Sequence, residues 1–301
     1  GEAKEHLGRI LSSGRLSHAY LFTGPRGSGK TAFALALAEW VNGIANLSDP
    51  VGGARSGKSS WHAHPDIHVF FPMPSGTSET DRLTRLEWLA QDPYELIDYA
   101  NRPAISPLQE RSGAEGARSG GGGGRRAGGA SKAGKSGGAP KTLKAFYSIQ
   151  TFRELIRPVT VLSPNEGTRT VVVMTGIETM RAETANAFLK LLEEPAGEVM
   201  FVLTADSVDS MLPTILSRCQ LIRLRPLRPE EIAGALTQRD GMSADDARFI
   251  ARMADGNYAL ARFFDPDGMR ERLDQLIEFL RKSYSLDPGA LVPLVDEWSS
   301  K

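Results

Sequence analysis

Hydrophobic residues follow two patterns along this chain, short unbroken apolar runs and longer segments with helical spacing. The apolar runs predict buried β-strands at 19–23, 67–71, 170–174 and 199–204. Helical spacing predicts helices at 4–13, 30–42, 84–99, 149–160 and 181–192. Because strands alternate with helices and the strands are apolar throughout, we expect an α/β fold, a doubly wound parallel sheet with helices on both faces.

Two segments break this alternation. Residues 112–141 hold 12 of the 31 glycines, six Lys or Arg and no aromatic or branched aliphatic side chain. Such a stretch cannot bury enough apolar surface to offset the entropy of ordering it, so we predict a flexible insertion. From Arg228 onward only helical patterns remain, and Pro229-Glu230-Glu231 is typical of a helix start. A small all-helical domain is therefore expected after the sheet.

Composition narrows the class of protein. The 36 basic and 36 acidic side chains balance, so any contact with DNA is expected to come from local patches or from partners. The single cysteine, Cys219, excludes a disulfide framework and a cysteine-based zinc site, and it fits a cytoplasmic location. No stretch of 18 apolar residues predicts a membrane span. Gly1 stands where a complete chain begins with Met, which indicates a fragment.

The strongest motif lies between the strand predicted at 19–23 and the helix predicted at 30–42. It matches G-x-x-x-x-G-K-[ST] and reads Gly24-Pro25-Arg26-Gly27-Ser28-Gly29-Lys30-Thr31. Glycines let backbone N–H groups curl around phosphates, and the following helix adds its dipole. Lys30 is expected to reach the β and γ phosphates of ATP or ADP, and the Thr31 hydroxyl to hold the accompanying Mg²⁺. The motif therefore predicts a nucleotide-binding loop.

Hydrolysis requires more than this loop. A P-loop ATPase carries an acid that holds Mg²⁺ and a Glu that orients water, at the end of a second strand. The strand predicted at 170–174 is followed by Thr175 and Gly176, and Glu178 comes two residues later. We therefore expect poor hydrolysis or none, with Glu178 as the only nearby substitute.

Three ordered motifs closely resemble the AAA+ subunits of the bacterial DNA polymerase III clamp loader. They are the segments 18–22 running into the phosphate loop, 64–66 (His-Pro-Asp), and the set 186–195, 201–204 and 212–219. The resemblance covers about residues 3–110 and 145–265. It implies an AAA+ core at 1–226, a helical lid at 227–265, and the start of a truncated helical collar domain at 266–301.

Departures from the family pattern indicate which branch is resembled. The motor subunits, gamma and tau, keep the acidic pair and carry a four-cysteine zinc module, whereas this chain has Thr175 and Gly176 and no cysteine at 42–64. Both losses resemble the delta-prime branch. The lid arginine of the family is also missing, since Ala259 stands at its position, although Arg262 is close enough to leave the register open.

The resemblance also implies roles for single residues. In Ser217-Arg218-Cys219, Arg218 matches the trans-acting arginine finger of clamp loaders, and the alternative is an Arg that satisfies the last carbonyls of a helix. Thr204, or Ala205 in another register, lies near where the family senses the γ-phosphate. Cys219 is expected to be a packed residue. Glu193, Glu194 and Pro195 fit either a solvated turn or an intersubunit contact.

The resemblance therefore implies a delta-prime-like subunit with little or no ATPase activity of its own. It further implies that the chain binds gamma/tau and delta subunits and the sliding clamp, and that it reaches primer-template DNA mainly through the complex. An active gamma/tau-like motor is the alternative, and a small-molecule P-loop kinase a third. The spacing of His62, His64, His68 and Asp66 suits a metal poorly, because no further carboxylate or thiol completes the set.

Overall fold

The structure is a computed structural model that describes residues 8, 16–44, 61–74, 76–92, 145–195, 197–209 and 211–284. The insertion predicted at 112–141 lies outside the described residues. So do nearly all of the helix predicted at 4–13 and the last part of the one predicted at 84–99. Contacts divide the chain into two compact units, residues 1–225 and 226–301, and each is described by itself.

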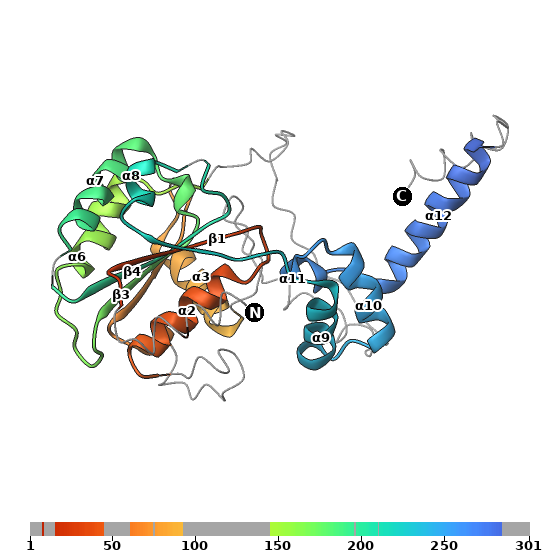
Figure 1. The fold of residues 1–301 in the computed structure, drawn as a ribbon, viewed down its shortest axis with the longest axis horizontal. Coiled ribbons are helices and arrows are strands. Elements are labelled where there is room, and N and C mark those ends of the chain that lie inside the picture. Colours follow the sequence, from red (N-terminus) through yellow and green to blue (C-terminus); the bar gives the residue numbers. More distant parts are fainter. Residues whose placement is uncertain are drawn as a thin grey trace, which may run out of the picture. The chain divides into compact units, whose positions relative to one another are not determined.

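The first unit is built around a parallel sheet (Figure 1). Its order is β2-β3-β4-β1-β5, and every neighbouring pair is parallel. The strands are β1 (Ala19–Thr23), β2 (Ile67–Phe70), β3 (Thr170–Met174), β4 (Val199–Ala205) and β5 (Gln220–Arg223). The four predicted strands are therefore present, and β5 is an additional edge strand.

Helices connect these strands. Before β3 come α2 (Lys30–Val41), a 3₁₀ turn η1 (Trp61–Ala63), α3 (Glu79–Gln91), α5 (Ile149–Thr151), a π-helical segment η2 (Phe152–Ile156) and α6 (Arg157–Val159). After it come a 3₁₀ turn η3 (Ile177–Thr179), α7 (Ala182–Glu193) and α8 (Pro213–Leu216). The helix predicted at 149–160 is thus one segment that changes its hydrogen-bond pattern twice.

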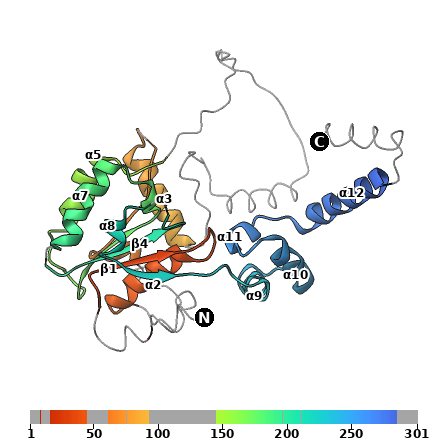
Figure 2. The same ribbon diagram turned by 45° about the horizontal axis from the view of Figure 1, so that its top comes forward.

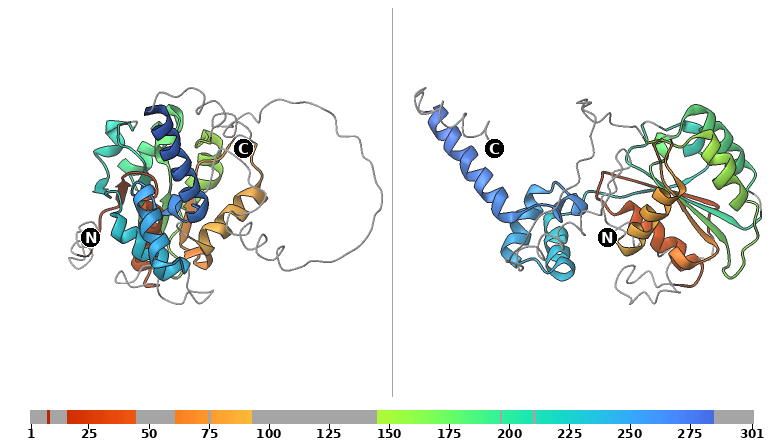
Figure 3. Two further views of the ribbon diagram at one scale, coloured as in Figure 1. Left: turned by 90° about the vertical axis from the view of Figure 1, so that its right-hand side faces the viewer. Right: turned by 180° about the vertical axis from the view of Figure 1, so that it is seen from behind.

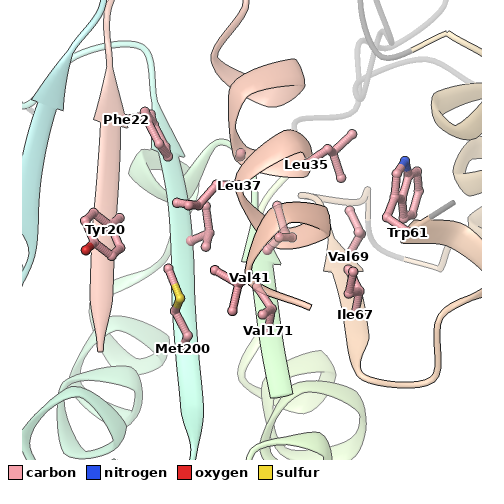
Figure 4. Packing of buried hydrophobic residues seen from close by; sticks show 14 of the residues in the cluster. Tyr20, Phe22, Leu35, Leu37, Val41, Trp61, Ile67, Val69, Val171 and Met200 are labelled. Carbon is pink, nitrogen blue, oxygen red and sulfur yellow. The ribbon is translucent and has the colours of Figure 1, made fainter. Parts of the chain in front are cut away.

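Helices cover both faces of the sheet, as Figures 1 and 3 show with α2 and α3 on one side and α6 and α7 on the other. Alternate residues of each strand point to opposite faces. Tyr20 and Phe22 of β1 belong to the same buried cluster as Leu35 and Leu37 of α2 (Figure 4). Their neighbour Leu21 belongs to the cluster on the other face, together with residues of η2, α7 and α8. Burial on both faces explains the unbroken apolar runs, and the predicted doubly wound α/β sheet is confirmed.

Strand register brings the functional loops together. Thr23 at the end of β1 pairs with Ala205 at the end of β4, and Met174 at the end of β3 pairs with Leu203. Because all strands run in the same direction, the loops that follow β1, β3 and β4 share one edge of the sheet. We call this edge the carboxyl edge, and the opposite one the amino edge.

The second unit is all helical. Its helices are α9 (Pro229–Asp240), α10 (Ala244–Met253), α11 (Tyr258–Ala261) and α12 (Pro266–Tyr284), and Figure 2 shows α12 as one continuous helix. Arg270 of α12 pairs with Asp246 of α10 and lies 4.9 Å from the ring of Phe249. The predicted division between a lid and a collar at residue 265 stays a prediction. Among the described residues, no helix is long and apolar enough to cross a membrane.

Candidate phosphate-binding site

The loop from Gly24 to Gly29 joins β1 to α2 at the carboxyl edge. Gly27 and Gly29 have φ of 74° and 85°, a left-handed conformation that side chains with a Cβ rarely adopt. Gly24 is required for a different reason, since a Cβ there would overlap the carbonyl oxygen of Leu224. The backbone N–H of Leu224 donates to the carbonyl of Thr23 at 2.7 Å, so the chain leaving β5 is held against the loop.

Lys30 begins α2, and its side chain is only 9% exposed. Its ammonium group donates to the carbonyl oxygens of Gly24 at 2.8 Å and Pro25 at 2.7 Å. It also lies 2.9 Å from Oδ1 of Asp206. These are three acceptors for a group with three N–H donors, so the hydrogen-bonding capacity of Lys30 is used within the site.

Asp206 is the residue that sequence reasoning missed. It directly follows β4, and its Oδ2 accepts a hydrogen bond at 2.8 Å from Nε of Arg26 in the loop. Burial by itself would raise the pKa of Asp206, but its hydrogen bonds with Arg26 and Lys30 outweigh that effect and lower the pKa. The carboxylate is therefore ionised at neutral pH and neutralises the buried ammonium group.

Glu178, in η3, is the second acid at this edge. Its Oε1 accepts a hydrogen bond at 3.3 Å from the backbone N–H of Asp206, and its Oε2 is buried without a hydrogen-bond partner among the described residues. Burial raises the pKa of Glu178. The structure thus brings Glu178 close to the loop, but anchors one of its oxygens on the backbone beyond β4.

The end of β3 is tied to β4 by Thr204. Its buried hydroxyl accepts a hydrogen bond at 3.3 Å from the backbone N–H of Gly176. Thr204 pairs with Phe22, and Ala205 pairs with Thr23 at the end of the strand. The residue that follows this strand, Asp206, forms the ion pair with Lys30.

This arrangement suits a phosphate group. Two left-handed glycines curl the loop ahead of a 12-residue helix, whose N-terminus favours an anion. The hydroxyl of Ser28 is buried and has no hydrogen-bond partner within the described part of the chain, as expected for a group that waits for an acceptor. Thr31 is half-buried in the first turn of α2. The geometry of the loop is therefore suited to a phosphate group. Thr31 follows Lys30 in the first turn of α2, where its hydroxyl could bind a metal ion that accompanies the phosphate.

Arg218 lies elsewhere in the first unit. It precedes Gln220, where β5 starts beside Tyr20, whereas the phosphate loop follows the other end of β1. Arg218 is therefore at the amino edge, away from the loop of its own chain. Its Nη2 donates to Oε1 of Glu193 at 2.7 Å, and its Nη1 donates to the carbonyl of Thr214 at 3.0 Å. The side chain remains 34% exposed.

The remaining candidates have structural contacts. Asp66 is buried, and its carboxylate accepts hydrogen bonds from the backbone N–H groups of residues 165–167. His64 accepts one from the backbone of Asp66, and no cluster of His, Cys, Asp or Glu among the described residues suits a metal ion. Arg262 pairs at 2.9 Å with Asp240 of α9. Ala259 is buried. Cys219 is a separate case, since its own burial raises the pKa of its thiol to about 12.

Comparisons with known proteins support one family. The delta-prime subunit of DNA polymerase III from Bacillus subtilis is 24% identical over 289 residues, covering 96% of this chain and 66% of that protein. The Pseudomonas aeruginosa delta-prime subunit is 31% identical over 139 residues, covering 44% of this chain and 41% of that protein. The tau subunit of B. subtilis is 24% identical over 301 residues, covering 96% of this chain and 39% of that protein. The chain thus spans less than two thirds of the length of these relatives.

A protein-family model matches the whole of the first unit. The model described as DNA polymerase III, delta subunit, matches residues 1–228, which include the whole sheet and the phosphate loop. The AAA+ fold predicted from the motifs agrees with the observed sheet order and with the position of the loop after β1. The chain therefore belongs to the DNA polymerase III delta subunit family.

Proposed function

We propose that the chain is a delta-prime-like subunit of the DNA polymerase III clamp loader. It supports ATP-dependent loading of the sliding clamp onto primer-template DNA, in a complex with gamma/tau and delta subunits. It contributes Arg218 in trans to the nucleotide of a neighbouring subunit, and it turns over little or no ATP itself.

The position of Arg218 carries this proposal. A guanidinium group stabilises the charge that develops on a phosphoryl group during transfer, provided that it reaches that group. Arg218 precedes β5 at the amino edge, whereas its own phosphate loop lies at the carboxyl edge. An arginine so placed lies away from the nucleotide site of its own chain, so any nucleotide that it serves is held by another chain. Its guanidinium group bonds to Glu193 and to the carbonyl of Thr214, and the side chain remains 34% exposed.

The phosphate loop supports nucleotide binding without turnover. Lys30, Ser28 and the curled backbone would hold the phosphates of ATP or ADP, with Thr31 for Mg²⁺. When bound, the metal would neutralise phosphate charge. However, β3 is followed by Thr175, whose hydroxyl is not a base toward water, and by Gly176, which has no side chain. One oxygen of Glu178 is engaged with the backbone of Asp206, and we expect the carboxylate to contribute little to that role.

The second unit offers a surface for assembly. Three large apolar side chains of α12 are exposed, namely Leu276 at 43%, Ile277 at 38% and Leu280 at 57%. Their spacing places them on neighbouring positions of one helix surface. Exposed apolar side chains grouped in this way are typical of a contact with another protein, which supports α12 as part of the predicted collar.

The proposal is tested in a loader reconstituted from its subunits. Arg218→Ala in this chain should lower the DNA-stimulated ATPase rate of the complex by at least about tenfold, because a trans arginine contributes strongly to phosphoryl transfer. Arg153→Ala, which removes an exposed arginine of η2, serves as the matched control. An unchanged ATPase rate with Arg218→Ala, in a complex that still assembles, would falsify the trans role.

An active motor like gamma or tau is the second candidate. The intact Lys30 and Thr31 and the similarity to the tau subunit favour it. The steady-state ATPase rate of the isolated chain separates the two candidates. Turnover near 1 s⁻¹, an ordinary rate for a dedicated enzyme, supports the motor, and a rate at least about a hundredfold lower supports the delta-prime-like subunit.

A further inference from the structure

We propose that Asp206 acts as an intramolecular substitute for a nucleotide phosphate. Its carboxylate holds both cations of the phosphate loop, Lys30 and Arg26, and thereby weakens the binding of nucleotide to this chain. The inference rests on the proposed binding of nucleotide at the loop, and it adds a residue that tunes that binding.

Every N–H donor of Lys30 faces an acceptor within the site. Its ammonium group has three N–H donors. Two point to the carbonyl oxygens of Gly24 and Pro25, which belong to the loop itself, and the third faces Oδ1 of Asp206. A phosphate that binds Lys30 must therefore displace a partner. Asp206 is the anionic one, so its carboxylate competes with phosphate for the same charge.

Both oxygens of Asp206 take part. While Oδ1 lies 2.9 Å from Lys30, Oδ2 accepts from Nε of Arg26 at 2.8 Å. The Lys30 side chain is 9% exposed and that of Asp206 is 35% exposed, so solvent screens their attraction only in part. Arg26 is 82% exposed, and its pair is weaker. A phosphate arriving while Asp206 stays in place would meet a second anion at short range.

The backbone fixes Asp206 where it competes. The preceding residue, Ala205, pairs with Thr23 at the end of β1, just before the loop. The N–H of Asp206 donates to Glu178. The backbone that carries the carboxylate is thus anchored to the sheet that also carries the loop, which distinguishes this contact from an ion pair between two mobile surface side chains.

The test compares nucleotide affinity in the full chain with Asp206 neutralised. ADP is titrated into wild-type protein, Asp206→Asn and the control Asp209→Asn, first without Mg²⁺ and then with it. Asp209 is exposed and lies three positions away, so the control removes the same charge from the neighbourhood. We expect Asp206→Asn to bind ADP about tenfold more tightly without Mg²⁺, and the control to match the wild type.

Unchanged or weaker ADP binding by Asp206→Asn overturns the inference. Weaker binding only when Mg²⁺ is present would instead mark Asp206 as a residue that helps to hold the metal, and would also overturn it. Thermal unfolding checks that the variant is folded. If Asp206→Asn does not fold, Asp206→Ser is used with the same expectation.

Lys30→Ala separates this inference from the proposed function. If it abolishes ADP binding while Asp206→Asn leaves affinity unchanged, nucleotide binding at the loop stands and the inference alone falls. If ADP binds equally well to Lys30→Ala and to wild-type protein, binding at the loop fails. If Asp206→Asn binds ADP and the wild type shows no binding over the titrated range, the inference holds, because Asp206 then suppresses nucleotide binding at the loop. If neither binds, both fall.

Discussion

Glu193 and Arg218 form an ion pair in which Nη2 of the arginine donates to Oε1 of the glutamate at 2.7 Å. They lie 25 positions apart, Glu193 at the end of α7 and Arg218 in the turn before β5. A second hydrogen bond joins Nη1 to the carbonyl of Thr214 in α8. The guanidinium group is therefore oriented from two helices, which limits the directions in which it can point.

Neutralising this glutamate should loosen the arginine without removing it. Glu193→Gln keeps an acceptor oxygen and loses the charge, so we expect the DNA-stimulated ATPase rate of a reconstituted loader to fall by about two- to fivefold, in line with a partly exposed ion pair. Glu194→Gln changes the adjacent exposed carboxylate and should leave the rate at the wild-type value. Equal effects of the two variants would contradict a positioning role for Glu193.

Much of the first unit could be predicted from the sequence because its determinants are local. The strand at Thr170–Met174 is an unbroken apolar run, and the phosphate loop is contiguous and rich in glycine. The helix predicted at 84–99 begins earlier, at Glu79, since its first turn is polar and is fixed by a capping box between Ser78 and Asp81. Apolar spacing cannot detect such a start.

The contacts that define the site could not be predicted in the same way. Arg26 and Asp206 are 180 positions apart, and only the pairing of β1 with β4 brings them together. The strand β5 was missed because it has four residues and only one of them, Ile222, is buried. A single sequence gives no signal for such pairings, whereas the acid that follows β4 is a usable clue once the sheet order is known.

Asp66 should contribute to stability in a pH-dependent way. Burial by itself would raise its pKa, but hydrogen bonds from the backbone N–H groups of Asn165, Gly167 and Glu166 lower the pKa below its ordinary value. A carboxylate with a lowered pKa in the folded state stabilises the fold above its unfolded pKa, near 4. That stabilisation should disappear as the pH falls through the folded pKa.

Asp66→Asn tests this contribution. The amide keeps one acceptor oxygen and turns an N–H group toward other N–H donors, so the free energy of unfolding at pH 7 should fall by about 1–3 kcal/mol. Urea unfolding at pH 7 and at pH 3 measures the free energy of unfolding of wild-type protein and Asp66→Asn. The difference between the two proteins should be smaller at pH 3. Glu87→Gln, an exposed change in α3, should alter stability little. A difference that persists undiminished at pH 3 would refute the assignment.

Cys219 should react slowly in the folded chain. Burial raises the pKa of its thiol to about 12, so very little thiolate is present at pH 8. Because it is the only cysteine, a thiol reagent reports on this position alone. We expect labelling at pH 8 to be at least about a hundredfold slower in native protein than in urea. Native and unfolded rates within about threefold of each other would show an accessible thiol instead.

Binding of a transition-state analogue tests the trans role of Arg218 most directly. A residue that acts on the transferring phosphoryl group stabilises the transition state more than the ground state. The measurement compares a reconstituted loader containing wild-type chain or Arg218→Ala, titrated with ADP alone and with ADP plus aluminium fluoride. We predict at least about tenfold weaker binding of the fluoride complex with unchanged binding of ADP. Equal affinity of both loaders for the fluoride complex would contradict the proposal.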